Sequence, residues 1–325
     1  MAKLAYILAA SHSGSTLLSM LLGSHPQLAT IGEINLSPQA MGSLDRYRCS
    51  CGELIGQCEF WKKVQQGMAA RGHDFDLSNA GTDFKWVNSR YARRLLRPMY
   101  RGPVTEAIRD AALSISPTWR EQQSTLQRRN AALVSTALEI TGAQALVDSS
   151  KIGLRLKYLL RNAELDVRVI RLMRDGRAVA LTYMDPAGFA DAKDPNRRAG
   201  GMGGSRANER LQMAKAAFEW RRHVEEAEQL LRSLRPSQWI ELRYEEYCSQ
   251  PEETLARIFR FLGVESSHQP NTFRSVRQHV VGNGMRLDTT SEIQCDERWR
   301  TQLTERDLQV FDEIAGDANR RYRYE

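Results

Sequence analysis

The 325-residue chain has no run of the roughly 18 or more consecutive apolar residues that a membrane-spanning helix needs. Its first apolar run, Leu4 to Ala10 before Ser11, has the outline of a short signal peptide. That run is at the lower length limit for a signal peptide, and cleavage after it would separate a strand from its turn. We therefore predict neither a membrane span nor a cleaved signal.

Cysteine is scarce, and its spacing is not that of a small secreted disulfide scaffold. The five cysteines are an odd number, which favours a reducing compartment, and we predict the cytoplasm. Three of them lie close together, as Cys49, Cys51 and Cys58. Their CxC spacing is not the usual CxxC of zinc sites, and no fourth ligand is nearby in the sequence. We interpret them as packed or redox-labile thiols, with zinc as the alternative, and predict no metal.

The classical nucleotide-binding motif GxxxxGK[ST] is also missing. No lysine follows Gly14, and no earlier glycine stands at the required distance. Its absence disfavours ATP or GTP chemistry of the classical kind.

What the sequence does have is a basic balance, with a net charge of +7 and a pI near 9.3. Such a surface attracts anions such as nucleotides, acidic glycans or nucleic acid. The arginines are spread along the chain rather than gathered in one tail, which argues against a nucleic-acid-binding arm. We predict no nucleic-acid partner.

Short apolar strands alternate with helical patterns along the chain. The expected strands cover 4–10, 145–148, 167–172 and 239–242, and expected helices cover 13–23 and 208–232. Strands that alternate with helices predict a parallel sheet between two helical layers. We expect an α/β three-layer sandwich with a central, mostly parallel sheet, formed by one domain over residues 1–325.

Two segments interrupt this pattern. Residues 84–138 are mostly helical with proline breaks, which predicts a helical insertion. Residues 185–207 contain a glycine-rich run, which predicts a flexible loop that either gates a substrate or only connects two elements.

The strongest functional signal lies directly after the first expected strand. Gly14 allows a close approach of backbone to phosphate, and the amides that follow it lie at the positive end of a helix. The predicted phosphate-binding residues are Ser11, His12, Ser13, Gly14, Ser15, Thr16 and Leu17. An ordinary serine-rich helix cap is the alternative interpretation.

This segment resembles the 5′-phosphosulfate loop of sulfotransferases that use 3′-phosphoadenosine 5′-phosphosulfate (PAPS). The segment Arg174 to Tyr183, which follows another strand, resembles the 3′-phosphate motif of the same family. The resemblance implies a fold like that of P-loop NTPases and assigns the 3′-phosphate to Arg174 and Thr182. A guanidinium binds phosphate in a bidentate manner, and a hydroxyl two helical turns along can reach the same anion.

Three further segments resemble the bacterial and Golgi-like branches of this family, in the family's order. They are 148–151 (DSSK), 242–247 (LRYEEY) and 282–286 (GNGMR). The resemblance adds Asn283 and Arg286 to the residues expected to bind PAPS.

The resemblance implies transfer of a sulfuryl group to an acceptor hydroxyl without a metal. Glu33 is the leading candidate for the base that takes the acceptor's proton, and His12 is the alternative. His12 also stands where many members carry a lysine or arginine, so either His12 or Lys151 stabilises the departing phosphate.

The acceptor is expected to be a carbohydrate or a small alcohol. Two other functions remain open: a kinase that lacks the standard lysine, and a non-catalytic binder of acidic polymers. We make no prediction of the oligomeric state from the sequence.

Overall fold

The computed structural model describes residues 1–33, 47–78, 80–85, 87–96, 102–186, 210–266 and 273–324. The predicted glycine-rich loop, 185–207, lies outside these residues except for its first two positions. Descriptions of structure below refer to these ranges.

A five-stranded parallel sheet forms the centre of the molecule, with strand order β2-β3-β1-β4-β5. The strands are β1 (Ala2–Ala9), β2 (Leu28–Gly32), β3 (Ala145–Lys151), β4 (Leu165–Met173) and β5 (Trp239–Arg243). The predicted parallel sheet is therefore confirmed. The sequence pattern did not predict β2, because Leu28–Gly32 is short and has no regular alternation of apolar and polar residues.

The central strand β1 is buried on both faces, as its continuous apolar run predicts. Leu4, Tyr6 and Leu8 pack into the core on one side of the sheet. The alternate residues Ala5 and Ile7 pack into the core on the other side. One strand thus supplies both cores, and the sheet requires a helical layer on each face.

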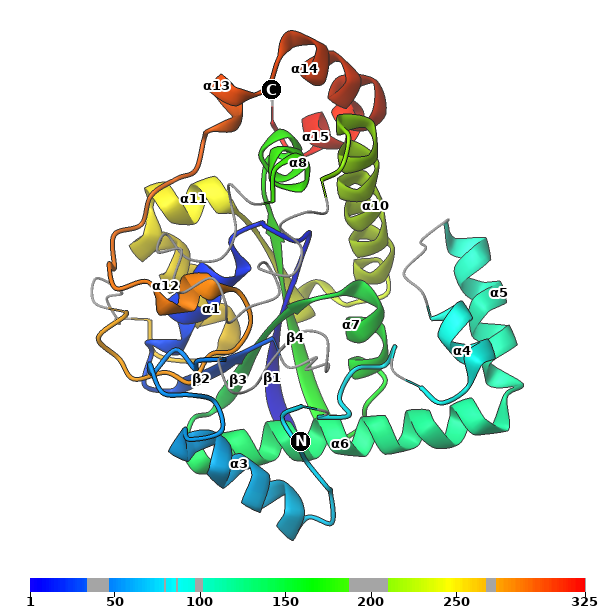
Figure 1. Cartoon of the computed structure of the whole chain (residues 1–325), viewed down its shortest axis with the longest axis vertical. Coiled ribbons are helices and arrows are strands. Elements are labelled where there is room, and N and C mark those ends of the chain that lie inside the picture. The colour runs from blue at the N-terminus through cyan, green and yellow to red at the C-terminus, as the bar shows by residue number, and fades with distance from the viewer. Residues whose placement is uncertain are drawn as a thin grey trace.

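Helices cover both faces of the sheet (Figure 1). One layer contains α1 (Ser15–Gly23), α11 (Tyr244–Ser249) and α12 (Pro251–Leu262). The other contains α3 (Glu59–Ala70), α6 (Pro117–Thr141), α7 (Gly153–Leu159) and α10 (Met213–Leu231). The predicted three-layer sandwich is therefore present.

The end of α12 shows how the sequence determines a local boundary. Leu255, Ile258 and Phe259, at positions i, i+3 and i+4, lie on one face of the helix and are fully buried. Gly263 then adopts φ +73, the left-handed conformation that ends a helix at little cost for glycine.

A small group of helices, drawn partly from the C-terminal segment, packs beside α10 at one end of the sheet (Figure 1). It contains α8 (Gly176–Met184), α14 (Glu305–Phe311) and α15 (Asp317–Arg321), and α13 (Trp299–Gln302) lies against α8. Trp220 and Phe311 are buried at its centre. This group closes the sheet beyond the end of β4.

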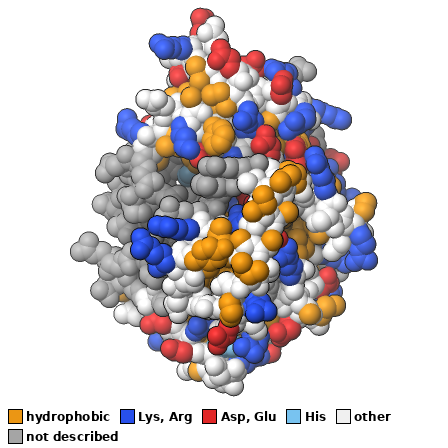
Figure 2. Space-filling view, turned by 90° about the vertical axis from the view of Figure 1, so that its right-hand side faces the viewer, with side chains coloured by type: hydrophobic (Ala, Val, Ile, Leu, Met, Phe, Trp, Pro, Cys, Tyr) orange, Lys and Arg blue, Asp and Glu red, His pale blue; other side chains and the backbone are white. Residues whose placement is uncertain are grey.

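The predicted insertion is helical, with α4 (Arg90–Leu95) and α5 (Pro103–Ser114) preceding α6. The face on which α4 and α5 lie carries hydrophobic side chains at its centre (Figure 2). Exposed large apolar residues on or next to these helices are Tyr91, Val104, Ile108 and Ile115. No helix among the described residues has the length and apolarity needed to cross a membrane.

Candidate functional site

The β1–α1 loop lies at the carboxyl end of the central strand, where ligands of α/β proteins bind. Gly14 caps α1 with φ +83, and no side chain caps this helix end. The first amides of a helix have no intrahelical acceptor, so those of Ser15, Thr16 and Leu17 are donors available to an anion. The predicted phosphate loop therefore has the required backbone geometry.

Two tyrosines of the predicted LRYEEY segment lie against this loop. The Tyr247 hydroxyl donates a hydrogen bond to the Gly14 carbonyl oxygen at 2.9 Å. A Cβ at Gly14 would lie 2.1 Å from that hydroxyl oxygen and 2.6 Å from the Tyr244 ring. Only glycine fits at this position, for reasons of both φ and space.

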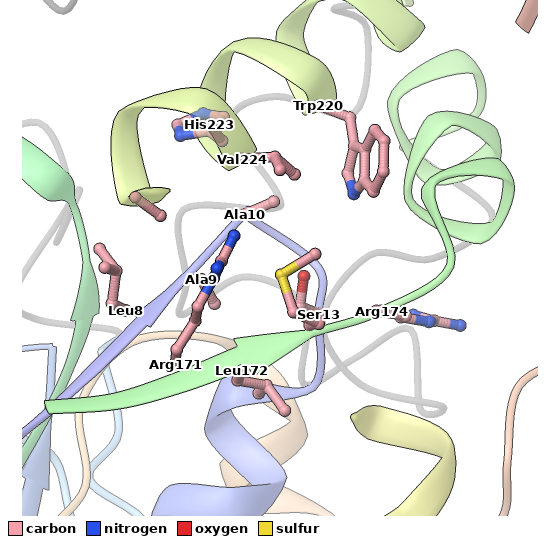
Figure 3. Close-up of a pocket in the computed structure, with 12 residues that line it drawn as sticks. Leu8, Ala9, Ala10, Ser13, Arg171, Leu172, Arg174, Trp220, His223 and Val224 are labelled. Atoms are coloured by element: carbon pink, nitrogen blue, oxygen red, sulfur yellow. The ribbon is translucent and has the colours of Figure 1, made fainter. Parts of the chain in front are cut away.

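Ser13 points into a small cavity between β1, β4 and α10 (Figure 3). Its hydroxyl oxygen is buried and has no hydrogen-bond partner among the described residues. Arg171 and His223 line the same cavity, and burial lowers the pKa of His223 to about 3. A buried hydroxyl without a partner is costly, so the Ser13 hydroxyl is a candidate donor to a ligand at the loop.

Arg174, at the start of the predicted 3′-phosphate motif, contacts the loop directly. Its Nη1 donates to the His12 carbonyl oxygen at 2.8 Å. Its Nη2 donates to the carbonyl oxygen of Asp296 at 2.8 Å and pairs with that residue's carboxylate at 3.0 Å. The guanidinium also lies over the Tyr244 ring, 4.3 Å from its centre. The two resembling segments thus meet in space.

Asp296 is a partner of Arg174 that the sequence analysis did not identify. Burial alone would raise its pKa, but hydrogen bonds and charge from Arg298 and Arg174 lower it to about 2. It lies 122 positions from Arg174 in a segment without regular structure, so no spacing or periodicity could have revealed it.

His12 itself has φ +64, which is unusual for a residue other than glycine. Its ring meets the Tyr183 ring of α8 edge-on, with centroids 5.6 Å apart. The loop is thus attached to β4 and α8 through both the backbone and the side chain of His12.

The remaining residues of the 3′-phosphate motif have structural partners. Asp175 caps α8 by accepting from the Arg177 amide, and the Gly176 amide donates to Asn319. The Thr182 hydroxyl is buried and donates to the Ala178 carbonyl oxygen. Within the described ranges, no contact joins Thr182 to Arg174, so its role toward a phosphate stays a prediction.

Glu33 and Lys151 form an ion pair at the carboxyl ends of β2 and β3, with Nζ and Oε1 2.5 Å apart. Both side chains are mostly buried, at 17% and 15% exposure. Lys151 pairs with Leu8 of β1, so the pair lies at the edge of the sheet from which the phosphate loop projects. The structure therefore brings together two of the three residues predicted to take part in catalysis.

A buried network fixes the strand end that carries Lys151. Asp148 is fully buried and accepts from Arg155 Nε at 3.0 Å and from the Ser150 amide at 2.8 Å. Arg155 also donates to the Thr82 carbonyl oxygen and to Asn130 of α6. The acid of the DSSK segment therefore has a positioning role, and it sets the direction of the following lysine.

Asn283, predicted to bind PAPS, caps the short helix Gly284–Leu287, which contains the other predicted residue, Arg286, and contacts α1. Asn283 accepts from the Met285 amide. Arg286 is buried over the Tyr47 ring and donates to the carbonyl oxygens of Arg48 and Gly282. In this structure Arg286 joins two segments of the chain, and its binding of a ligand remains a prediction.

A family model matches most of the chain. The model described as "Sulfotransferase family" matches residues 5–268. No curated protein matches significantly.

Solved structures with similar folds include the sulfotransferase domain of the Synechococcus PCC 7002 olefin synthase. It is 16% identical, with a TM-score of 0.48 over 96% of this chain and 94% of that one. Sulfotransferase STF9 from Mycobacterium avium is 14% identical, with a TM-score of 0.47 over 100% of this chain and 78% of that one.

Proposed function

The chain belongs to the sulfotransferase family, and we propose that it transfers a sulfuryl group from PAPS to the hydroxyl of an acceptor. The observation that carries the proposal is the hydrogen bond from Arg174 to the His12 carbonyl oxygen. It joins the loop suited to a 5′-phosphate to the segment that resembles a 3′-phosphate motif, 162 positions away. A donor with anions at both ends suits such a pair of segments.

The loop residues fit the 5′ end of this donor. The unpartnered amides of Ser15, Thr16 and Leu17 and the buried Ser13 hydroxyl can all donate to phosphate oxygens. When bound, PAPS supplies an activated sulfuryl group attached to its 5′-phosphate. The amides then stabilise the negative charge that develops on the departing phosphate.

Arg174 is proposed to bind the 3′-phosphate after exchanging partners. In this structure its Nη2 is paired with Asp296. A phosphate in contact with Arg174 would compete with this carboxylate, so donor binding is expected to displace the Asp296 side chain. The hydrogen bond from Arg174 to His12 would meanwhile keep the loop in place.

Glu33 is proposed as the base that removes the acceptor's proton. The carboxylate lies at the sheet edge beside the loop, and Lys151 orients it through their ion pair. Lys151 is the register partner of Leu8 near the end of β1, and we propose that its ammonium group stabilises charge on the reacting group. Since His12 turns its ring toward Tyr183 of α8, we assign the base to Glu33 and leave to His12 the positioning of the loop.

We propose a hydroxyl acceptor, a carbohydrate or a small alcohol, and a single domain over residues 1–325. The insertion with α4, α5 and α6 exposes several large apolar side chains, so we expect it to contribute to acceptor choice.

Thermal unfolding with added nucleotides tests the proposal. Adenosine 3′,5′-bisphosphate at about 100 times its Kd should stabilise the native state by about 2.7 kcal/mol and raise Tm by several degrees. Adenosine 5′-monophosphate, the matched control without the 3′-phosphate, should raise Tm much less.

Three outcomes would contradict the proposal. A larger shift with ATP and magnesium would support the kinase, and a steeply salt-dependent shift with any polyanion would support the non-catalytic binder. Equal Tm shifts with both adenosine nucleotides would show that the 3′-phosphate does not contribute to binding.

A further inference from the structure

Away from the phosphate loop, four side chains with soft metal-binding atoms come together. They are Cys49, Cys51, Cys58 and His279, and their ligand atoms all lie within 4.8 Å of one another. The Sγ atoms of Cys51 and Cys58 are 3.7 Å apart. The Nδ1 atom of His279 lies 3.3 Å from Cys58 Sγ and 3.7 Å from Cys49 Sγ.

Three of the separations, at 3.3 to 3.7 Å, are close to the edges of a metal-centred tetrahedron. With Zn–S bonds of about 2.3 Å and Zn–N bonds of about 2.0 Å, tetrahedral geometry places neighbouring ligand atoms roughly 3.5 to 3.8 Å apart. A disulfide requires its sulfurs at about 2.0 Å, and the cysteines are free thiols in this structure. Ordinary packing gives no reason for three sulfurs and a ring nitrogen to converge on one point.

The surroundings are those of a built site. Cys49 and Cys58 are fully buried, and Cys58 is the N-cap residue of α3, where a helix favours a thiolate. The His279 ring stacks on Phe60 with centroids 4.6 Å apart and planes 4° from parallel, which fixes the ring's orientation. The Ser50 hydroxyl donates to the Gln278 carbonyl oxygen and accepts from the Val280 amide. These bonds fix the segment that carries the cysteines relative to the segment that carries His279.

We propose that Cys49, Cys51, Cys58 and His279 bind one structural zinc ion. Three thiolates and one imidazole complete a tetrahedral shell, which leaves no open position for a substrate. The four ligands come from two segments, 47–58 and 278–282, that are more than 200 positions apart, and zinc would link them. The His279 ligand is the one that CxC spacing could not indicate, since it lies 221 positions from Cys58.

The segment that contains His279 is hydrogen-bonded to the backbone of the proposed base, Glu33. The backbone of Val281, two residues after the histidine, pairs with the edge of β2 by donating to the Ile31 carbonyl oxygen at 3.0 Å. Its own carbonyl oxygen accepts from the Glu33 amide at 3.2 Å. Zinc at the cluster therefore supports the segment against which Glu33 is placed, without contact with donor or acceptor.

Metal analysis of the whole chain tests the proposal. Protein purified without chelators and under mild thiol protection should contain about one zinc per chain by inductively coupled plasma mass spectrometry. Exchange for Co²⁺ should give the intense visible absorption of a tetrahedral thiolate site. Cys49→Ser and Cys58→Ser should lose zinc, whereas Cys248→Ser and Cys295→Ser, which change the two cysteines outside the cluster, should retain it.

A measurement on the unaltered protein covers the case in which Cys58→Ser does not fold. Stepwise blocking of thiols with a mercurial reagent should release the zinc, detected by a chromogenic chelator, as about three thiols are modified. Metal-free protein with five free thiols that also fails to bind added Zn²⁺ or Co²⁺ would overturn the proposal. A Cys51–Cys58 disulfide found in the freshly purified protein, by a mass two hydrogens lower, would overturn it as well.

Discussion

Tyr247 and Gly14 are 233 positions apart in the chain, yet the tyrosine hydroxyl donates to the glycine carbonyl oxygen at 2.9 Å. This bond fixes the peptide between Gly14 and Ser15, whose amide is the first donor of α1. The β1–α1 loop is therefore oriented by α11 as well as by its own strand.

Tyr247→Phe should weaken binding of adenosine 3′,5′-bisphosphate about fivefold, since a buried hydrogen bond contributes about 1 kcal/mol and its loss lets the loop peptide reorient. Isothermal titration calorimetry measures the affinity. Tyr91→Phe, which removes the hydroxyl of a half-exposed tyrosine, is the control and should leave affinity unchanged. Unchanged binding by Tyr247→Phe would show that the bond has no part in donor binding.

Gly14→Ala should both destabilise the protein and abolish measurable binding of the bisphosphate. The left-handed φ costs about 1 to 2 kcal/mol for alanine, and the contact with Tyr247 adds about 1 to 3 kcal/mol. Gly142→Ala is the matched control, because Gly142 has φ +70 but open space around its Cβ position. Urea unfolding should give a larger loss for Gly14→Ala, and equal losses would contradict the steric argument.

Glu33→Gln should lower kcat by about 10²- to 10⁴-fold, the usual contribution of a general base, while bisphosphate affinity stays within about twofold. Steady-state rates with a sulfated product as readout, together with calorimetry, separate the two effects. Glu59→Gln alters an exposed carboxylate that also pairs with a lysine, Lys62, and should leave both quantities unchanged.

The same experiments with His12→Gln distinguish the two candidate bases. If His12 positions the loop, this variant should lose donor affinity more than it loses kcat. A large fall in kcat at normal affinity for His12→Gln, with Glu33→Gln nearly active, would reverse the assignment.

Arg174→Ala should weaken bisphosphate binding by at least about 30-fold, because loss of a buried charged partner costs 2 kcal/mol or more. Arg298→Ala provides a matched control. Arg298 pairs with the same Asp296 carboxylate but is half-exposed, so its loss should change affinity little. Equal effects of the two substitutions would place the 3′-phosphate elsewhere.

The Asp296 carboxylate predicts a specific acid dependence of stability. Its pKa is lowered from 3.8 to about 2 in the folded protein, so its ionised form stabilises the fold above the unfolded value and this stabilisation is lost as pH falls toward 2. The difference in unfolding free energy between wild type and Asp296→Asn should therefore be constant near neutrality and shrink between about pH 4 and pH 2. A difference independent of pH in urea titrations would contradict the lowered pKa.

The sequence predicted the sheet and the loop because both depend on local patterns. Residues 4–10 form a continuous apolar run, and Gly14 follows it at the distance that a strand–turn–helix unit needs. Gly263 at the end of α12 is a similar case, since its role depends only on the helix before it. Edge strand β2, with five residues and no alternation, lacked such a pattern.

What the sequence could not predict are contacts between distant segments. Asp296 meets Arg174, and His279 meets Cys58, only in the folded chain, because these partners are 122 and 221 positions apart. The resemblance to the family indicated Glu33 and Lys151 as candidates, but their ion pair depends on β2 and β3 being neighbours. Packing, rather than local propensity, therefore decides these parts of the site.

The position of β1 at the centre of the sheet has a consequence for synthesis on the ribosome. Its neighbours are β3 and β4, so Leu4 has no strand to pair with until Leu146 and Val167 have been made. At about 5 to 20 residues per second, the first strand waits roughly 10 to 30 s with both apolar faces exposed. A nascent chain in this condition is a natural client for chaperones that bind extended apolar segments. Its folding should be slow, since nearly every strand contact spans a large part of the chain.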